Sequence, residues 1–359
     1  MVAHGIVVLM HEELFLATNR LIFFMLLAFG LSAIAARGLV GIATHVGLMD
    51  MPGGRKQHAA PVPVIGGIAM FFGFAAAALG SGLVVGPTLA LIAALGLLVV
   101  GGVADDMHDI TPRTKFVIQL IAALFMTSWA GVYVSSLGPL LGFGPATLYN
   151  WAIPFSVVCA LGVINAINMV DGLDGSAGGI ALVATLWLAL AAYLQRLGTQ
   201  TMLLLMLASA IAGFLMWNLR VPGRAHARVF MGDAGAMMLG LALCWFTIDV
   251  TQGERRTMPP IACVWILAVP LLDMARVMFL RLLRRTDMFD GDREHLHHYL
   301  IARGYSVSRT VAILMAASAV TGAIGIGAWQ LGVPDWVMFY LFAALAAAVL
   351  RAAYTRARG

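Results

Sequence analysis

The chain has 359 residues, of which 61% are hydrophobic and only 11% are charged. An ordinary soluble domain carries about 25% charged residues, so this composition excludes a water-soluble globular protein. It also excludes a disordered protein, because disordered segments are poor in apolar residues. The apolar residues form long runs instead of alternating strands of about ten residues, which excludes a membrane β-barrel. The composition predicts an all-α protein that crosses a membrane several times.

Apolar runs that approach the roughly 20 residues needed to cross a bilayer recur along the whole chain. No internal repeat or linker separates them, so we expect one integral-membrane domain over residues 1–359, with a long cytoplasmic connection over 281–308. The eleven predicted spans are 21–41, 64–82, 87–104, 116–134, 151–167, 178–195, 201–217, 235–250, 259–280, 309–329 and 334–351.

The basic residues predict the orientation of these spans. With a periplasmic N-terminus, eleven spans place the C-terminus in the cytoplasm, and only Arg20, Arg196, Arg255 and Arg256 remain outside. The other 18 of the 22 Lys and Arg residues then lie inside, as cytoplasmic connections require. The net charge of +5 is therefore attributed to topology, and no nucleic-acid partner is expected.

Acidic residues also gather on the predicted cytoplasmic side, where charge topology alone does not call for them. The first group is "DDMHDITPRTK", in which Asp105 and Asp106 precede Lys115. Two adjacent carboxylates beside hydrocarbon are costly unless a cation or hydrogen bonds hold them. The alternative interpretation is a solvated charge cluster at the end of a helix.

A second group follows the fifth predicted span in "NAINMVDGLDGSAGG", which contains Asn165, Asn168, Asp171 and Asp174. Amide and carboxylate oxygens suit a hard cation such as Mg²⁺, and glycines let a backbone approach a ligand closely. A polar turn between two spans is the simpler alternative.

A third group, "RVFMGDAG", places Asp233 just before the eighth predicted span, where it could act only as a helix cap. Asn218, at the inner end of the seventh span, is equally open to a structural or a substrate-binding interpretation. Asp273 lies within the ninth span, and a pair with Arg276 three residues later is a sufficient structural explanation.

The fourth group is the histidine segment "DREHLHHYL", with Arg293, His295, His297 and His298. It lacks a cysteine partner and the H-E-x-x-H spacing of zinc sites, so we interpret it as a phosphate-binding group. That role predicts that Arg replaces His297 better than Gln does, because Arg keeps a positive charge. Lys56 is a weaker phosphate candidate, because the orientation of the protein explains its charge.

Together these motifs resemble the polyprenyl-phosphate N-acetylhexosamine-1-phosphate transferases (the MraY/WecA superfamily). The matching segments are "RKQHAAPVPVIGG", "DDMHDITPRTK", "NAINMVDGLDG", "RVFMGDAG" and "DREHLHH", in this order over roughly residues 50–300. The histidine segment is most similar to the branch that transfers GlcNAc 1-phosphate and starts O-antigen or related surface polysaccharides. Where many relatives have Ser, this chain has Ala236.

The resemblance implies transfer of N-acetylhexosamine 1-phosphate, with GlcNAc the usual sugar, from a UDP-sugar to undecaprenyl phosphate, with release of UMP. It implies Mg²⁺, with Mn²⁺ as the alternative ion, held by Asp233 and Asn168. It also implies an active site at the cytoplasmic face of the bacterial inner membrane, and a homodimer. Asp105 and Asp106 would position or deprotonate the lipid phosphate, and Lys115, His295 and His297 would hold phosphates. The substrate-binding residues would be Lys56, Asn165, Asp171, Asp174, Asn218, Arg293 and His298, with Asp174 at the uracil.

Three alternatives stay open at this point. The phospho-MurNAc-pentapeptide branch of the same family lacks support because its "HHHFE"-like ending is missing. A secondary transporter would have its polar site near the bilayer midplane and often shows repeats, whereas the acidic residues here lie at one edge. A CDP-alcohol type transferase would need further paired acids downstream of "DGLDGSAGG", which are missing.

Overall fold

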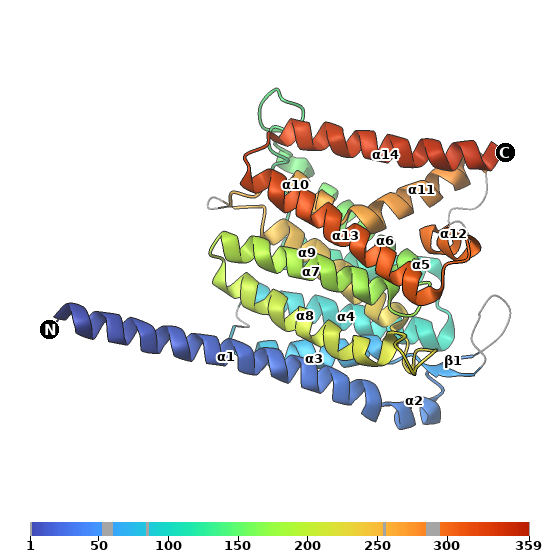
Figure 1. Cartoon of the computed structure of the whole chain (residues 1–359), viewed down its shortest axis with the longest axis horizontal. Coiled ribbons are helices and arrows are strands. Elements are labelled where there is room, and N and C mark those ends of the chain that lie inside the picture. The colour runs from blue at the N-terminus through green and yellow to red at the C-terminus, as the bar shows by residue number, and fades with distance from the viewer. Residues whose placement is uncertain (1, 52–59, 84–85, 254–255, 285–294, 359) are drawn as a thin grey trace.

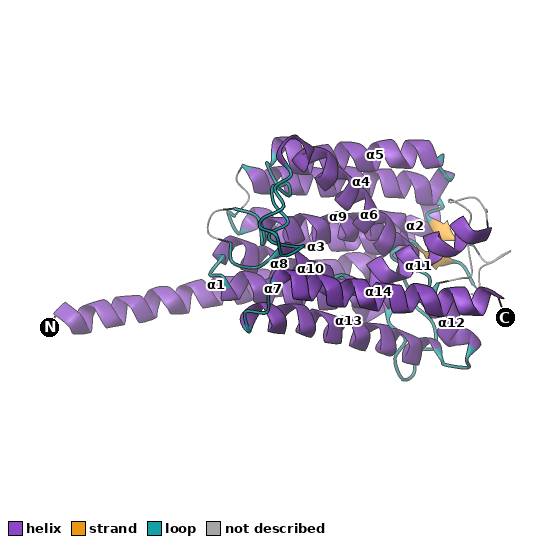
Figure 2. Ribbon diagram, turned by 90° about the horizontal axis from the view of Figure 1, so that it is seen from above, coloured by secondary structure: helices purple, strands orange, loops and turns teal. Residues whose placement is uncertain are grey.

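The computed structural model describes residues 2–51, 60–83, 86–253, 256–284 and 295–358. Over these ranges the protein is a bundle of roughly parallel helices, with one short two-stranded sheet at an end of the bundle (Figures 1 and 2). The helices are α1 (Val2–Gly38), α2 (Val40–Val46), α3 (Gly66–Gly80), α4 (Pro87–His108), α5 (Pro112–Leu124), α6 (Ala152–Val170), α7 (Ser176–Leu194), α8 (Gly198–Asn218), α9 (Gly232–Asp249), α10 (Pro260–Ile266), α11 (Ala268–Arg284), α12 (Leu296–Ala302), α13 (Val307–Gln330) and α14 (Asp335–Arg358).

Four shorter elements complete the described structure. A π-helical turn, η1 (Phe125–Trp129), extends α5, and a 3-10 turn, η2 (Tyr149–Trp151), leads into α6. Strands β1 (Met49–Asp50) and β2 (Val62–Pro63) pair antiparallel, with Met49 opposite Pro63 and Asp50 opposite Val62. The all-α membrane fold predicted from composition is confirmed.

Helix α9 lies at the centre of the bundle, and nearly all of its residues are buried. Small residues let its neighbours approach it closely. A Cβ atom on Gly102 of α4 would lie 2.2 Å from the Cα of Ala234, and one on Gly67 of α3 would lie 2.2 Å from the nitrogen of Gly235. Such backbone contact is typical of packing between membrane helices, and here it fixes the first turn of α9 against α3 and α4.

Each predicted span coincides with a helix or an adjoining pair of helices. Among the described residues, seven helices are long and apolar enough to cross a membrane, and the bent pair α10 and α11 could be an eighth. The helices at 64–82, 116–134 and 235–250 fall short of that test. The count of eleven crossings and their orientation therefore stay predictions.

Two predicted spans differ from the structure in shape. The segment 259–280 is broken at Leu267, where α10 and α11 meet at an angle of 78°. Pro270 has no N–H to donate to Ile266, so a straight helix cannot continue there. The first helix begins at Val2, far before the predicted start at residue 21, and α1 projects beyond the bundle (Figure 1).

The polar motifs converge on one end of the bundle, because they lie at the end of α4, α6 and α8 and at the start of α5, α7 and α9. Strand β1 and helix α12 lie at this same end, and the chain termini lie at opposite ends of the molecule (Figure 1). The alternation of helix directions therefore brings together segments far apart in the sequence.

Candidate active site

The site begins with the tight turn between α4 and α5. Asp109 ends α4 in a left-handed conformation with φ of 46°. Two residues later the Thr111 hydroxyl accepts a hydrogen bond from the Thr114 N–H, and Pro112 occupies the first turn of α5, both common at a helix start. The turn places Lys115 in the first turn of α5, where its Nζ lies 2.8 Å from Oδ2 of Asp105.

The first turn of α9 is held by Asp106 of α4. The N–H of Asp233 donates to Asp106 Oδ1 at 3.0 Å, and the N–H of Ala234 donates to Oδ2 at 3.5 Å. Gly232 precedes them with φ of 69°, and a Cβ there would lie 2.5 Å from Asp106 Oδ2. Because Asp106 satisfies these N–H groups, the Asp233 carboxylate does not serve as the helix cap.

The Asp233 carboxylate instead joins three helices. Its Oδ2 lies 2.6 Å from Lys115 Nζ of α5, and its Oδ1 accepts a short hydrogen bond from the Asn168 amide of α6. Burial opposes the charge of Asp233, but a side-chain hydrogen bond with Asp105, the charge of Lys115 and the hydrogen bond from Asn168 outweigh it and hold the pKa of Asp233 below its usual value. The result is an ionised carboxylate at the centre of the polar end of the bundle.

The segment after α6 adds further carboxylates. The pKa of Asp171 is raised to about 8, mainly by burial and also by the negative charges of Asp233, Asp106 and Asp174. Asp174 is instead paired, because its Oδ2 accepts from Arg220 Nε at 2.7 Å and from the N–H of Ala227 at 3.0 Å. The negative charge around Asp171 is therefore in excess, which is the condition for binding a cation.

Asn218 holds this segment in place. Its Oδ1 accepts from the N–H of Gly175 at 2.7 Å, and its Nδ2 donates to the carbonyl of Val229 at 2.8 Å. The buried amide thereby joins the start of α7 to the strand-like segment that leads to Asp233. Asn218 is buried and positions two motifs within the described structure.

The histidine segment is anchored to the bent helix α11. Asp273 Oδ2 lies 3.0 Å from His295 Nδ1, and Asp273 Oδ1 accepts from the N–H of Leu296 at 2.8 Å. Arg276 also contacts Asp273, at 3.4 Å, as the spacing predicts. The pair with Arg276 is thus only part of the explanation for Asp273, whose main partners belong to the histidine segment.

His297 connects that segment to the loop after α6. A Cβ on Gly172 would lie 2.2 Å from His297 Nε2, so the imidazole packs directly on the Gly172 backbone. Burial lowers the pKa of His297 to about 3, and the neighbouring His298 and His295 act in the same direction. His297 is therefore neutral, and its buried Nε2 has no hydrogen-bond partner among the described residues.

Comparison with known proteins agrees with this arrangement. Residues 88–251 match the family model described as glycosyl transferase family 4. Undecaprenyl-phosphate alpha-N-acetylglucosaminyl 1-phosphate transferases of Yersinia pestis and Haemophilus influenzae are each 33% identical over 304 residues. The alignments cover 84% of this chain and 82% and 85% of those proteins. The protein of the same description from Escherichia coli (strain K12) is 32% identical over 305 residues, which cover 84% of this chain and 82% of that protein.

The chain belongs to glycosyl transferase family 4. Membership confirms the resemblance found in the motifs and makes the protein a multi-pass membrane enzyme of the transferase class. It also removes the secondary transporter from consideration.

In this family member, five elements bring most of the predicted site residues to one end of the bundle. Asp105, Asp106, Lys115, Asn168 and Asp233 form one hydrogen-bonded group. Asp171, Asp174, His295, His297 and His298 adjoin it through the loop after α6 and its contact with His297. Lys56 and Arg293 lie outside the described residues.

Asn165 connects two helices of the site. Its amide donates to Gln119 Oε1 at 3.1 Å and to the carbonyl of Leu161 at 2.8 Å, so it joins α5 to α6. Three residues that the sequence did not single out, Gln119, Gly172 and Arg220, have partners among the predicted site residues. Arg220 follows Asn218 by two residues, and this short distance in the sequence could have indicated that Arg220 lies near the site.

The donor atoms fit a hard divalent cation. Among the described residues no three His, Cys, Asp or Glu side chains already form a metal cluster, because the Lys115 ammonium lies between Asp105 and Asp233. The surrounding groups are oxygen donors, and the excess negative charge that raises the pKa of Asp171 favours a cation beside it. Mg²⁺ prefers such oxygen ligands.

Proposed function

We propose that the protein transfers GlcNAc 1-phosphate from UDP-GlcNAc to undecaprenyl phosphate and releases UMP at the cytoplasmic face of a bacterial inner membrane. An oxygen of the lipid phosphate attacks the β-phosphorus of UDP-GlcNAc. The bond from that phosphorus to the bridging oxygen breaks, and UMP leaves with its electron pair. The observation that carries this proposal is the Asp105–Lys115–Asp233–Asn168 group in a family member whose relatives carry that activity in their names.

Both substrates are anionic, so the main barrier is electrostatic. Lys115 supplies a fixed positive charge beside Asp105 and Asp233, and such charges stabilise phosphoryl transfer. Asp233, Asn168 and Asp171 would hold Mg²⁺, which, when bound, neutralises diphosphate oxygens. The lipid phosphate has a second pKa near 6, so it is largely a dianion at neutral pH and needs no strong base.

The acceptor can reach the group from the lipid. Asp106 and Lys115 are each followed by an exposed apolar residue, Met107 and Phe116. Val117 and Ile121 extend this apolar surface along α5. A prenyl chain lying on these side chains would carry its phosphate to Lys115 without leaving the bilayer.

Because His297 is neutral, it can form a hydrogen bond to the substrate but cannot neutralise the charge of a phosphate. Its unpartnered Nε2 faces the loop that carries Asp171 and Asp174. We propose that this loop and the histidine segment bind the UDP-sugar. The Asp174 carboxylate is held in position for this by Arg220 and the N–H of Ala227.

The test is release of UMP by the purified protein from a panel of UDP-sugars, with and without undecaprenyl phosphate. We expect UMP only when the lipid is present, with UDP-GlcNAc the best donor and activity lost on removal of divalent cations. If UDP-MurNAc-pentapeptide were the only donor in the panel that gave UMP, the protein would belong to the phospho-MurNAc-pentapeptide branch. Release that ignores the lipid would contradict the proposal.

A further inference from the structure

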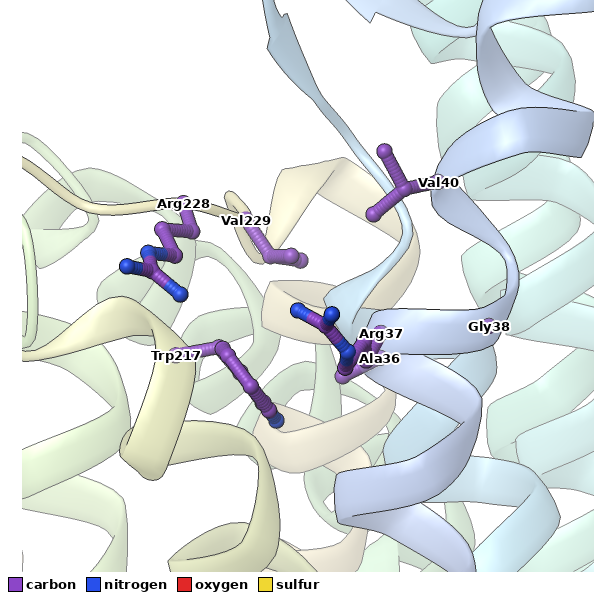
Figure 3. Close-up of a pocket in the computed structure, with 7 residues that line it drawn as sticks. All are labelled: Ala36, Arg37, Gly38, Val40, Trp217, Arg228 and Val229. Carbon is purple, nitrogen blue, oxygen red and sulfur yellow. The ribbon is translucent and has the colours of Figure 1, made fainter.

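A cavity lies at the end of α1, outside the carboxylate group. It has a volume of about 450 Å³ and lies between the end of α1, the end of α8 and the segment before α9 (Figure 3). Arg37, Trp217 and Arg228 supply its polar and aromatic lining, and Val40 and Val229 supply apolar lining. In Figure 3 the two arginine side chains lie on opposite sides, Arg228 at the left and Arg37 at the right, with the indole of Trp217 below and between them.

The cavity is built from fixed parts. The indole N–H of Trp217 donates to the carbonyl of Ala33 in α1 at 2.9 Å, which fixes the ring. The N–H of Arg228 donates to the carbonyl of Trp217 at the same distance. The guanidinium carbons of Arg37 and Arg228 lie 5.5 and 5.7 Å from the centre of the indole ring, within cation–π range.

Two like charges converge on this one ring. Within the described ranges, neither guanidinium forms an ion pair or hydrogen bond. Topology explains why arginines lie at this end of the bundle, but it does not explain why two of them share one tryptophan. An anion between them would relieve the repulsion, and guanidinium groups bind phosphate oxygens in a forked geometry.

The surroundings of the cavity indicate where the anion comes from. Ile34, one turn before Arg37, is 71% exposed, and Met216, beside Trp217, is 50% exposed. These apolar side chains contact hydrocarbon in a membrane, so the cavity lies at the level of the lipid headgroups. Tryptophan is enriched at that level, and basic pockets between helices on the cytoplasmic side bind anionic headgroups.

We infer that Arg37, Trp217 and Arg228 form a binding site for the phosphate of an anionic phospholipid headgroup. The site is separate from the transfer reaction and does not depend on the function proposed above. Arg228 lies five residues before Asp233 in the segment that Asn218 holds through Val229. A bound headgroup would therefore fix the segment that leads into the first turn of α9.

The test measures lipid binding by native mass spectrometry of the purified full-length protein. We expect phosphatidylglycerol to bind at least about tenfold more tightly than phosphatidylcholine, and Arg37→Gln/Arg228→Gln to weaken phosphatidylglycerol binding by at least about tenfold. The matched control is Arg309→Gln/Arg351→Gln, which removes two exposed arginines elsewhere in the chain. The control should stay within about twofold of the unaltered protein.

A second variant keeps the test decisive if the Gln pair fails to fold. Arg37→Lys/Arg228→Lys retains both charges and should keep the preference for phosphatidylglycerol at reduced affinity. Equal binding of the two lipids, or an equal loss in the control, would overturn the inference. Displacement of phosphatidylglycerol by an equal concentration of inorganic phosphate would overturn the assignment to a lipid.

Discussion

Asp233 is the residue at which the described site converges, because its carboxylate contacts Lys115 and Asn168 while Asp106 caps its helix. Asp233→Asn keeps the shape of the side chain and removes the charge that a Mg²⁺ ligand needs. We expect turnover to fall by about 10²-fold or more with normal folding. Turnover is measured as UMP release at limiting Mg²⁺.

Asp249 provides a matched control for this change. It lies at the other end of α9 and pairs with Arg256, far from the carboxylate group. Asp249→Asn should leave turnover within about twofold. Near-normal activity in Asp233→Asn at limiting Mg²⁺ would place the metal elsewhere.

The raised pKa of Asp171 predicts how the stability of the protein depends on pH. Its folded pKa of about 8 lies above the value near 3.9 of an unfolded chain, so the folded protein binds more protons between these values. Stability without divalent cations should therefore fall as the pH rises from about 4 to 8. Thermal unfolding in detergent at several pH values checks this, and the fall should be clearly smaller in Asp171→Asn.

The effect of Mg²⁺ on the same curve is a further check. A cation beside Asp171 favours its ionised form, so saturating Mg²⁺ should flatten the dependence between pH 4 and 8 in the unaltered protein. A curve that stays as steep with Mg²⁺ as without it would place the cation away from Asp171.

At the scale of elements, α11 and α12 act together through Asp273. Asp273→Asn keeps an acceptor for the Leu296 N–H but weakens the hold on His295. A shift of about 1 Å in a positioned group can cost ~10² in rate, so we expect a loss of this order with normal folding. Arg276→Gln, which removes the weaker 3.4 Å contact, is the control and should lose clearly less; an equal loss would contradict this account.

The contact of α12 with the loop after α6 reverses one expectation from the sequence. Because His297 is neutral and packs on the Gly172 backbone, there is no room for a guanidinium group. His297→Arg should therefore lose at least as much activity as His297→Gln. Better retention with Arg would support the original charge-neutralising role.

The sequence predicted which segments form the site but not how they contact one another. Residue types and spacing identified Asp105, Lys115, Asn168 and Asp233, because carboxylates beside hydrocarbon are energetically costly and usually have a function. The capping of α9 by Asp106 depends on the close packing of α4 on α9 at Gly102, which no local pattern encodes. The break at Leu267 had a signal in Pro270, whereas the link from Asp273 to His295 joins residues 22 positions apart.

At the scale of the whole molecule, the basic residues predict a cytoplasmic site. Single cysteines in a background without Cys159, Cys244 and Cys263 test this. Ala225→Cys lies in an exposed connection at the end of the bundle with the site, and Asn150→Cys is exposed at the opposite end. A membrane-impermeant thiol reagent should label only Asn150→Cys in intact spheroplasts. Labelling of Ala225→Cys would show that the predicted orientation is wrong.

The central claim is that sugar and phosphate move together onto the lipid. UDP-GlcNAc carrying ³²P in its β-phosphate, incubated with the purified protein and undecaprenyl phosphate, tests it most directly. We predict that the label enters the organic phase with the lipid and that unlabelled UMP remains in water. Label that remains in water as UDP, with GlcNAc on the lipid, would contradict the claim, because it would mean transfer of the sugar alone.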